Sequence, residues 1–146
     1  MTNPKLIKFA NQIINQLIDK VIIHRYDSYS TNSIYLKFDY GVARSLRISD
    51  HTGKKHLKYR FNLIESQAGT PHYVILNDNF PMNFYPPEEI DILVKDILAG
   101  RQQQIDKYRD YQAVMNKAKH DAEKQTKGFW KNAKIIQSRK EKQNIC

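Results

Sequence analysis

The side chains of this sequence that could do acid–base or metal chemistry are few and lie far apart. His51 and His56 are separated by five positions across a turn, with Asp50 beside them, and His24 falls in a different segment. Zinc sites usually combine more closely spaced cysteine and histidine ligands. Cys146 is the final residue, a poor place for a positioned nucleophile. The spacing therefore predicts no metal site and no cofactor.

Sequence motifs of nucleotide-dependent and hydrolytic enzymes are absent. The chain has no Walker motif, no glycine-rich dinucleotide fingerprint, no nucleophile elbow and no HExxH pair. Its five glycines are dispersed, which leaves no glycine-rich loop to surround a phosphate. We therefore expect a protein that is not an enzyme. A small nuclease with His24, His51 or His56 in its site is the alternative that the sequence supports least.

Cationic and aromatic side chains form a stronger pattern than the catalytic residue types. If the segments 33–40, 42–49 and 57–63 pair as neighbouring strands, one face of the sheet collects basic residues interleaved with rings. These candidate partner-binding residues are Tyr35, Lys37, Arg47, His56, Lys58 and Arg60. Such a face can bind nucleic acid through phosphates and stacked bases. It can also contact an acidic protein groove, or be an ordinary solvated strand face.

A second candidate surface lies near the C-terminus. Nine lysines and arginines between positions 117 and 142 surround Phe129 and Trp130. The candidate contact residues in this segment are Lys127, Trp130, Lys131 and Lys134. Aromatic anchors in a basic helix can dock into a protein groove or lie on a membrane surface. Alternatively, the two rings cap the core of the domain.

The net charge favours an acidic partner. The formal charge of +9 is uneven, because residues 1–100 carry a net charge of +2 and residues 101–146 one of +7. Nucleic acid and an acidic protein surface are the two partners that such asymmetry suggests. The alternative is a solvated helix that keeps the protein soluble.

The elements that must position these residues include three helical patterns. Apolar residues at intervals of three and four predict a first helix over about residues 4–20. A second helix is predicted over 87–99, with Gly100 as its end. A third, long and basic pattern begins at Arg101, with a break or kink at Gly128.

Alternation of apolar and polar residues predicts the strands. These are expected at 33–40, 42–49, 57–63 and 73–76. The links between the first three are short, and the link at 50–53 has the composition of a turn, which favours an antiparallel meander. A β-branched run at 21–23 is a further strand candidate that would extend to Asp27, whereas residues 77–87 are expected to be irregular.

Together these patterns predict an α+β fold. We expect a three- to four-stranded antiparallel sheet with helices packed on one face and a long basic C-terminal helix. The length of 146 residues predicts a single domain over 1–146, with an α+β core at 1–100 and a long basic helical extension at 101–146. The apolar stripe of the extension is compatible with packing inside the molecule and with a homodimer.

The sequence also indicates the cellular location of the protein. No apolar run approaches the length that crosses a membrane, and the N-terminus lacks the pattern of a secretory signal. A lone cysteine fits a reducing environment. We therefore expect no membrane partner and a cytoplasmic location.

Three segments carry a resemblance to a known class of proteins. Their sequences are SIYLKFDYG at 33–41, SLRISDH at 45–51 and GKKHLKY at 53–59. This stretch resembles small proteins carried by phages and other mobile elements of low-GC Gram-positive bacteria, and the richness of the chain in Ile, Lys, Asn and Tyr agrees with such a source. Several small proteins of such elements are anti-CRISPR proteins against Cas9-type nucleases.

The resemblance implies a non-enzymatic inhibitor of a host defence nuclease in the cytoplasm of the bacterial host cell. It would act by stoichiometric binding to a Cas9-type nuclease or its nucleoprotein complex. The basic charge argues against mimicry of DNA, which needs an acidic surface. It favours capping of an acidic domain, or contact through the nucleic acid of the nuclease. The alternative is a nucleic-acid-binding accessory protein of a phage or mobile element, with DNA or RNA as its partner.

Overall fold

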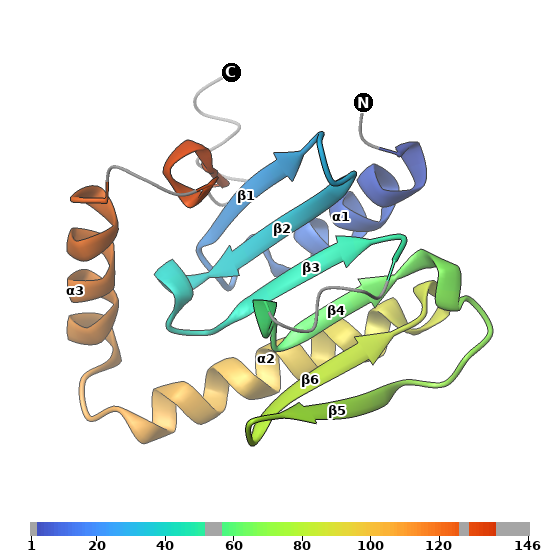
Figure 1. The fold of residues 1–146 in the computed structure, drawn as a ribbon. Coiled ribbons are helices and arrows are strands. Elements are labelled where there is room, and N and C mark those ends of the chain that lie inside the picture. Colours follow the sequence, from blue (N-terminus) through green and yellow to red (C-terminus); the bar gives the residue numbers. More distant parts are fainter. Residues whose placement is uncertain (1–2, 52–56, 126–128, 137–146) are drawn as a thin grey trace.

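A computed structural model describes residues 3–51, 57–125 and 129–136 of the chain (Figure 1). The helices are α1 (Pro4–Leu17), α2 (Ile90–Lys107) and α3 (Tyr111–Glu123). The strands are β1 (Ile23–Ser28), β2 (Ser33–Phe38), β3 (Ser45–Ser49), β4 (Phe61–Ile64), β5 (Tyr73–Asn77), β6 (Phe80–Tyr85) and β7 (Lys134–Ile136). The first helix is confirmed: Asn3 accepts a hydrogen bond from the backbone N–H of Lys5 at 2.9 Å, and Pro4 occupies the first turn.

The strands form one mixed sheet in the order β5-β6-β4-β3-β2-β1-β7. The helices α1 and α2 cover one face of this sheet (Figure 1), and the main core lies between them and the strands. Its fully buried members include Leu6, Ile13, Leu17, Ile34, Leu36, Phe38, Leu46 and Ile48. Burial of one such side chain contributes about 1.5–3 kcal/mol. A second, smaller buried cluster contains Ile64, Met82 and Phe84.

The expectation of a three- to four-stranded antiparallel sheet is wrong, because the sheet has seven strands and is mixed. The pairs β1–β2 and β2–β3 are antiparallel, but β4 runs parallel to β3 and β6 runs parallel to β4. The chain after Asp50 therefore crosses over instead of turning back as a hairpin. Side chains alternate with a period of two in both kinds of sheet, so the alternation could not reveal the strand direction.

Strand β6 forms in a segment that was expected to be irregular. Pro81 pairs with Leu76 of β5, whereas the pairing with β4 begins only at Asn83. Pro81 therefore lies where β6 has a neighbour on one side, and its missing N–H costs no hydrogen bond to β4.

The predicted helix end at Gly100 is also wrong, since α2 continues to Lys107. Gly100 lies within the helix and close to the sheet, where a Cβ atom would make an ordinary contact of 3.6 Å with Cζ of Phe61. Beyond it, the side-chain amide of Gln104 donates to the carbonyl oxygen of Val42 at 2.9 Å. This tertiary contact holds the last turns of α2 in place despite the low helix propensity of glycine.

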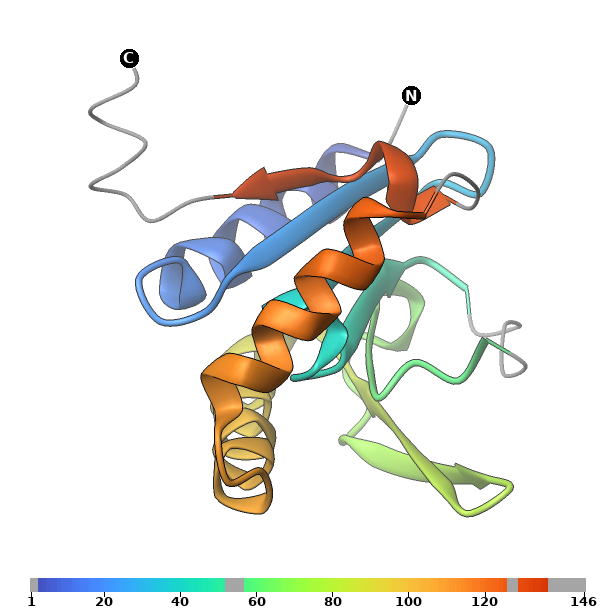
Figure 2. The same cartoon turned by 90° about the vertical axis from the view of Figure 1, so that its left-hand side faces the viewer.

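The prediction of a long basic C-terminal helix is wrong as well. The described part of 101–136 contains the end of α2, the separate helix α3, a 3-10 turn η5 (Phe129–Asn132) and β7. Asp110 starts α3, because its carboxylate accepts a hydrogen bond from the N–H of Ala113 at 3.1 Å. Figure 2 shows that β7 returns to the sheet and runs along β1, with which it pairs antiparallel. In the described ranges, no helix combines the length and the apolar character needed to cross a membrane.

A buried carboxylate ties α2 and α3 to one corner of the sheet. Asp39 opens the turn η1 (Asp39–Gly41) after β2 and is fully buried. One carboxylate oxygen accepts from the N–H of Ile22 at 3.0 Å. The other accepts from the hydroxyl of Tyr111 at 2.7 Å and from Nε of Arg101 at 2.5 Å. This corner fixes the start of α3 beside the sheet face that α1 and α2 do not cover.

Candidate functional site

The face of the sheet opposite α1 and α2 brings together titratable side chains from two neighbouring strands. His24 of β1 pairs directly with Lys37 of β2, and neighbouring side chains of this kind lie about 5 Å apart. The ring of Tyr40, from the turn after β2, meets the His24 imidazole edge-on with 5.1 Å between centroids. Tyr40 has a left-handed backbone with φ of 59°, and this conformation places its ring beside β1.

Trp130 is carried onto the same face by η5 and β7. The Nζ atom of Lys37 lies 4.4 Å from the centroid of the indole ring. The ring of Tyr35 meets the indole edge-on at 6.5 Å. A cation over an indole contributes about 0.5–2 kcal/mol, depending on exposure. These contacts, together with the pairing of β7 to β1, fix the half-buried tryptophan over β2.

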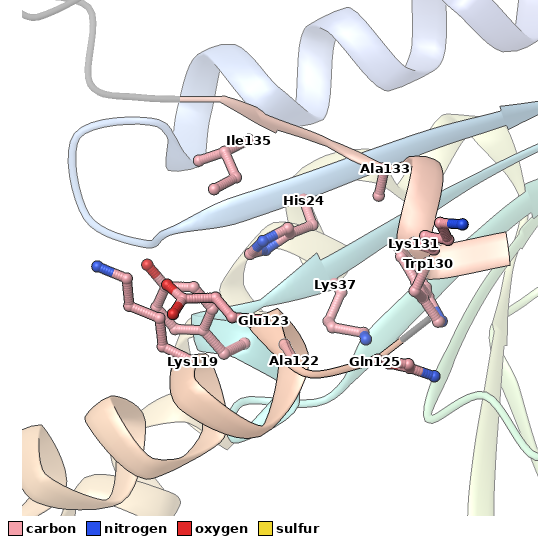
Figure 3. Close-up of a pocket in the computed structure, with 11 residues that line it drawn as sticks. His24, Lys37, Lys119, Ala122, Glu123, Gln125, Trp130, Lys131, Ala133 and Ile135 are labelled. Carbon is pink, nitrogen blue, oxygen red and sulfur yellow. The ribbon is translucent and has the colours of Figure 1, made fainter. Parts of the chain in front are cut away.

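A hollow of about 260 Å³ lies between β1, β2, α3 and η5. Figure 3 shows His24 and Lys37 on its floor, with Lys119 and Glu123 of α3 at one end and Trp130 and Lys131 at the other. The remaining lining residues are Tyr40, Ala122, Gln125, Ala133 and Ile135. We call this hollow the α3 pocket.

A second hollow, of about 330 Å³, lies on the other side of Trp130. Its lining residues are Gly41, Arg44, Ser45, Leu57, Lys58, Tyr59, Arg60, Phe80 and Trp130. Because Trp130 lines both hollows, they form one surface with an aromatic ring at its centre. We call this combined surface the Trp130 face.

The Trp130 face is cationic. Its basic side chains are Lys37, Lys119, Lys131, Arg44, Lys58 and Arg60. Among the described residues that line it, Glu123 is the one carboxylate. Lys58 also forms an ion pair with Asp78, with 2.9 Å between Nζ and the carboxylate oxygen. Both partners are exposed enough that water screens this pair, so the excess of positive charge persists.

Burial shifts the titration of the two groups on the floor. Desolvation lowers the pKa of His24, and the neighbouring Lys37 charge lowers it further. Desolvation also lowers the pKa of Lys37. His24 is therefore neutral at physiological pH. Its Nδ1 atom is buried without a hydrogen-bond partner in the described part of the chain.

The predicted sheet-face residues are only partly at the surface. Tyr35 is 5% exposed and Arg47 is 1% exposed, so neither lies on a solvated face as the alternation suggested. Tyr35 packs against Tyr59, with 5.4 Å between ring centroids. Nη2 of Arg47 lies 2.9 Å from Nδ1 of His51. Tyr59 and His51, from the link between β3 and β4, contact these two side chains, and such contacts could not be read from the strand pattern.

The other predicted site residues fall in different places. Lys37, Lys58, Arg60, Trp130 and Lys131 all line the Trp130 face. Lys58 and Arg60 belong to the segment before β4 and not to a strand.

Lys134 pairs with Arg25 across β7 and β1. The guanidinium of Arg25 donates a hydrogen bond to the side-chain oxygen of Asn11 in α1 at 3.2 Å. Lys134 therefore lies on the α1 side of the sheet. His56 and Lys127 lie outside the described residues.

Sequence reasoning did not select Tyr40, Arg44, Lys119 or Glu123 as site residues, and it named His24 only in the nuclease alternative. Tyr40 and Arg44 both have left-handed backbones, with φ of 59° and 76°, and the Gly41 between them was the one available signal of an irregular link. Lys119 and Glu123 reach the site because α3 is a separate helix that lies beside the sheet (Figure 1), which the continuation of one long helix would not do.

The described residues contain no group of three or more His, Cys, Asp or Glu side chains that could hold a metal ion. The Trp130 face therefore offers cations, a stacking surface and one carboxylate, which are the elements of a binding site for an anionic and aromatic ligand.

No protein-family model, no curated protein and no solved structure matches this chain.

Proposed function

We propose that the protein is a non-enzymatic nucleic-acid-binding protein that holds single-stranded DNA or RNA across the Trp130 face. The observation that carries this proposal is the position of Trp130 between two cationic hollows. An indole presents a flat surface on which any base can stack. Duplexes bury the faces of their bases, so stacking favours a single strand.

The cations on both sides of the indole would bind the phosphates that flank a stacked base. Lys37, Lys119 and Lys131 line one side of Trp130, and the arginines Arg44 and Arg60 line the other. Neutralisation of phosphates releases counterions, so affinity should fall with salt by a slope of about 0.7 per phosphate contact in a log–log plot.

The test uses Trp130 as its own reporter, because it is the single tryptophan of the chain. Single-stranded oligonucleotides should quench its fluorescence more than a duplex of the same length. The variant pair Lys119→Ala with Lys131→Ala should reduce the salt slope by about 1.4. Lys8 and Lys95 are exposed on α1 and α2, so the pair Lys8→Ala with Lys95→Ala removes equal charge and should leave the slope unchanged.

We also propose, from the resemblance of about residues 24–64 to proteins of phages and mobile elements, that the bound strand belongs to a Cas9-type nuclease complex and that binding inhibits the nuclease. The cationic Trp130 face supports contact through guide RNA or a displaced DNA strand. Tagged protein should capture a guide-loaded nuclease from a mixture of purified components and slow its cleavage of DNA. Failure both to bind and to inhibit a panel of such nucleases would contradict this second proposal.

A further inference from the structure

We infer that the α3 pocket holds one base of the bound strand and selects a base that carries an exocyclic amino group, with Glu123 as the acceptor. This inference rests on the proposed function and adds specificity to it. The Trp130 face would then bind most of a strand without regard to sequence, whereas one position would be read.

The shape of the α3 pocket favours a single base. Its volume of about 260 Å³ is just below the range of about 300–1,000 Å³ that is common for ligand sites. The His24 and Tyr40 rings form an aromatic pair at the end nearer to α3. Lys37 and Lys131 lie toward the Trp130 end of the same hollow (Figure 3). A base at the α3 end would thus leave its phosphate near the lysines and the next base beside the indole.

The polar groups at the α3 end match an amino-bearing base. Glu123 is exposed and lines the pocket, and a carboxylate accepts hydrogen bonds from an amino group such as N4 of cytosine. A carbonyl oxygen at the same position, as in uracil, would instead face the carboxylate with like partial charge. Lys119, one turn before Glu123 on α3, makes the pocket attractive to the anionic nucleotide as a whole.

His24 supplies the complementary donor. Its Nδ1 atom is buried and unpartnered within the described residues. A buried N–H without a partner is more costly than an unpaired acceptor, so the proton of the neutral imidazole belongs on Nε2. That N–H can donate to a ring nitrogen or carbonyl oxygen of the base. One donor and one acceptor in an aromatic pocket fit the edge of cytosine or adenine.

The test compares cytidine monophosphate with uridine monophosphate, which differ at two adjacent positions of the base. Cytosine has an amino group on C4 and an acceptor at N3, whereas uracil has a carbonyl oxygen on C4 and an N–H donor at N3. Binding is followed by calorimetry and by the NMR resonances of the His24 ring. Cytidine monophosphate should bind about tenfold more tightly. The substitution Glu123→Gln should reduce this preference to less than about threefold, because a neutral amide offers both a donor and an acceptor.

Asp121 provides a matched control on the same helix. Its carboxylate pairs with Lys117 at 3.3 Å and does not line the pocket, so Asp121→Asn should keep the tenfold preference. Equal affinity for the two nucleotides, or no binding of either, would overturn the inference. In that case quenching of Trp130 by an oligouridine strand would still support the proposed function, and the absence of that quenching would overturn both.

Discussion

Neutralisation of the buried carboxylate of Asp39 is the perturbation that most directly tests how the site is assembled. Asp39 joins β2 to α2 and α3 through three hydrogen bonds, from Ile22, Arg101 and Tyr111. Asparagine has nearly the same shape and tolerates the left-handed backbone at this position, where φ is 49°. The substitution Asp39→Asn therefore changes the hydrogen bonding and charge without adding backbone strain.

The expected cost follows from the number of acceptors. Both carboxylate oxygens of Asp39 are used, one by the N–H of Ile22 and the other by Arg101 and Tyr111 together. Asparagine has one oxygen, so at least one buried donor loses its partner, at about 1–3 kcal/mol. The loss of charge also weakens the bond to Arg101, whose side chain is 24% exposed. We expect a total loss of about 3 kcal/mol, a large share of the roughly 5–15 kcal/mol that folds a domain.

Urea unfolding followed by circular dichroism measures this loss. With a slope of about 2 kcal/mol per M, the midpoint should fall by about 1.5 M. Tyr111→Phe removes one of the three bonds and should cost about half as much. Asp50→Asn alters an exposed carboxylate and should change the midpoint little. A loss below about 1 kcal/mol for Asp39→Asn, or an equal loss for Asp50→Asn, would refute this account of the corner.

Further predictions concern the pocket floor and the core. The folded-state pKa of His24 lies below its usual 6.5, so the unfolded chain takes up the proton first and stability falls as the pH drops below about 6.5. The urea midpoint of the variant His24→Gln should therefore fall less steeply over this pH range than that of the unmodified protein. Tyr85 is fully buried and donates to Asp96 at 2.6 Å, so Tyr85→Phe should lower the unfolding free energy by about 1.5–3 kcal/mol in the same assay. Gly100→Ala should raise the thermal midpoint, because alanine stabilises a helix interior by about 0.5–1 kcal/mol relative to glycine. The added methyl group would make an ordinary contact with Phe61. A lower midpoint would show that this contact is too tight.

The sequence predicted those parts of the fold that depend on local periodicity. The first helix begins at its proline, and the alternation over Ile34, Leu36 and Phe38 places these side chains in the main core. Both follow from geometry that repeats within one element. The direction and the number of the strands depend instead on which segments pair. Leu46 and Ile48 pair with Phe61 and Leu63 in parallel, but the apolar residues in both strands recur every second position, as they would in an antiparallel hairpin.

The candidate site was predicted in part for the same reason. Lys37 and Trp130 were identified as binding residues from residue type, and the structure places them in contact. Arg47 was expected on a solvated face, but it is buried and contacts the link after β3. His24 and Glu123 reach the pocket through the pairing of β1 with β2 and the position of α3 beside the sheet, which are contacts between distant segments.

The measurement that tests the central claim most directly is a salt titration of Trp130 fluorescence with a single-stranded oligonucleotide of about 12 nucleotides. The account predicts quenching on binding and a steep loss of affinity as salt rises. It also predicts that Trp130→Ala, followed by fluorescence anisotropy of a labelled strand, weakens binding by about 1–3 kcal/mol. Binding that neither quenches Trp130 nor responds to salt, or no binding at all, would contradict the claim that this face holds nucleic acid.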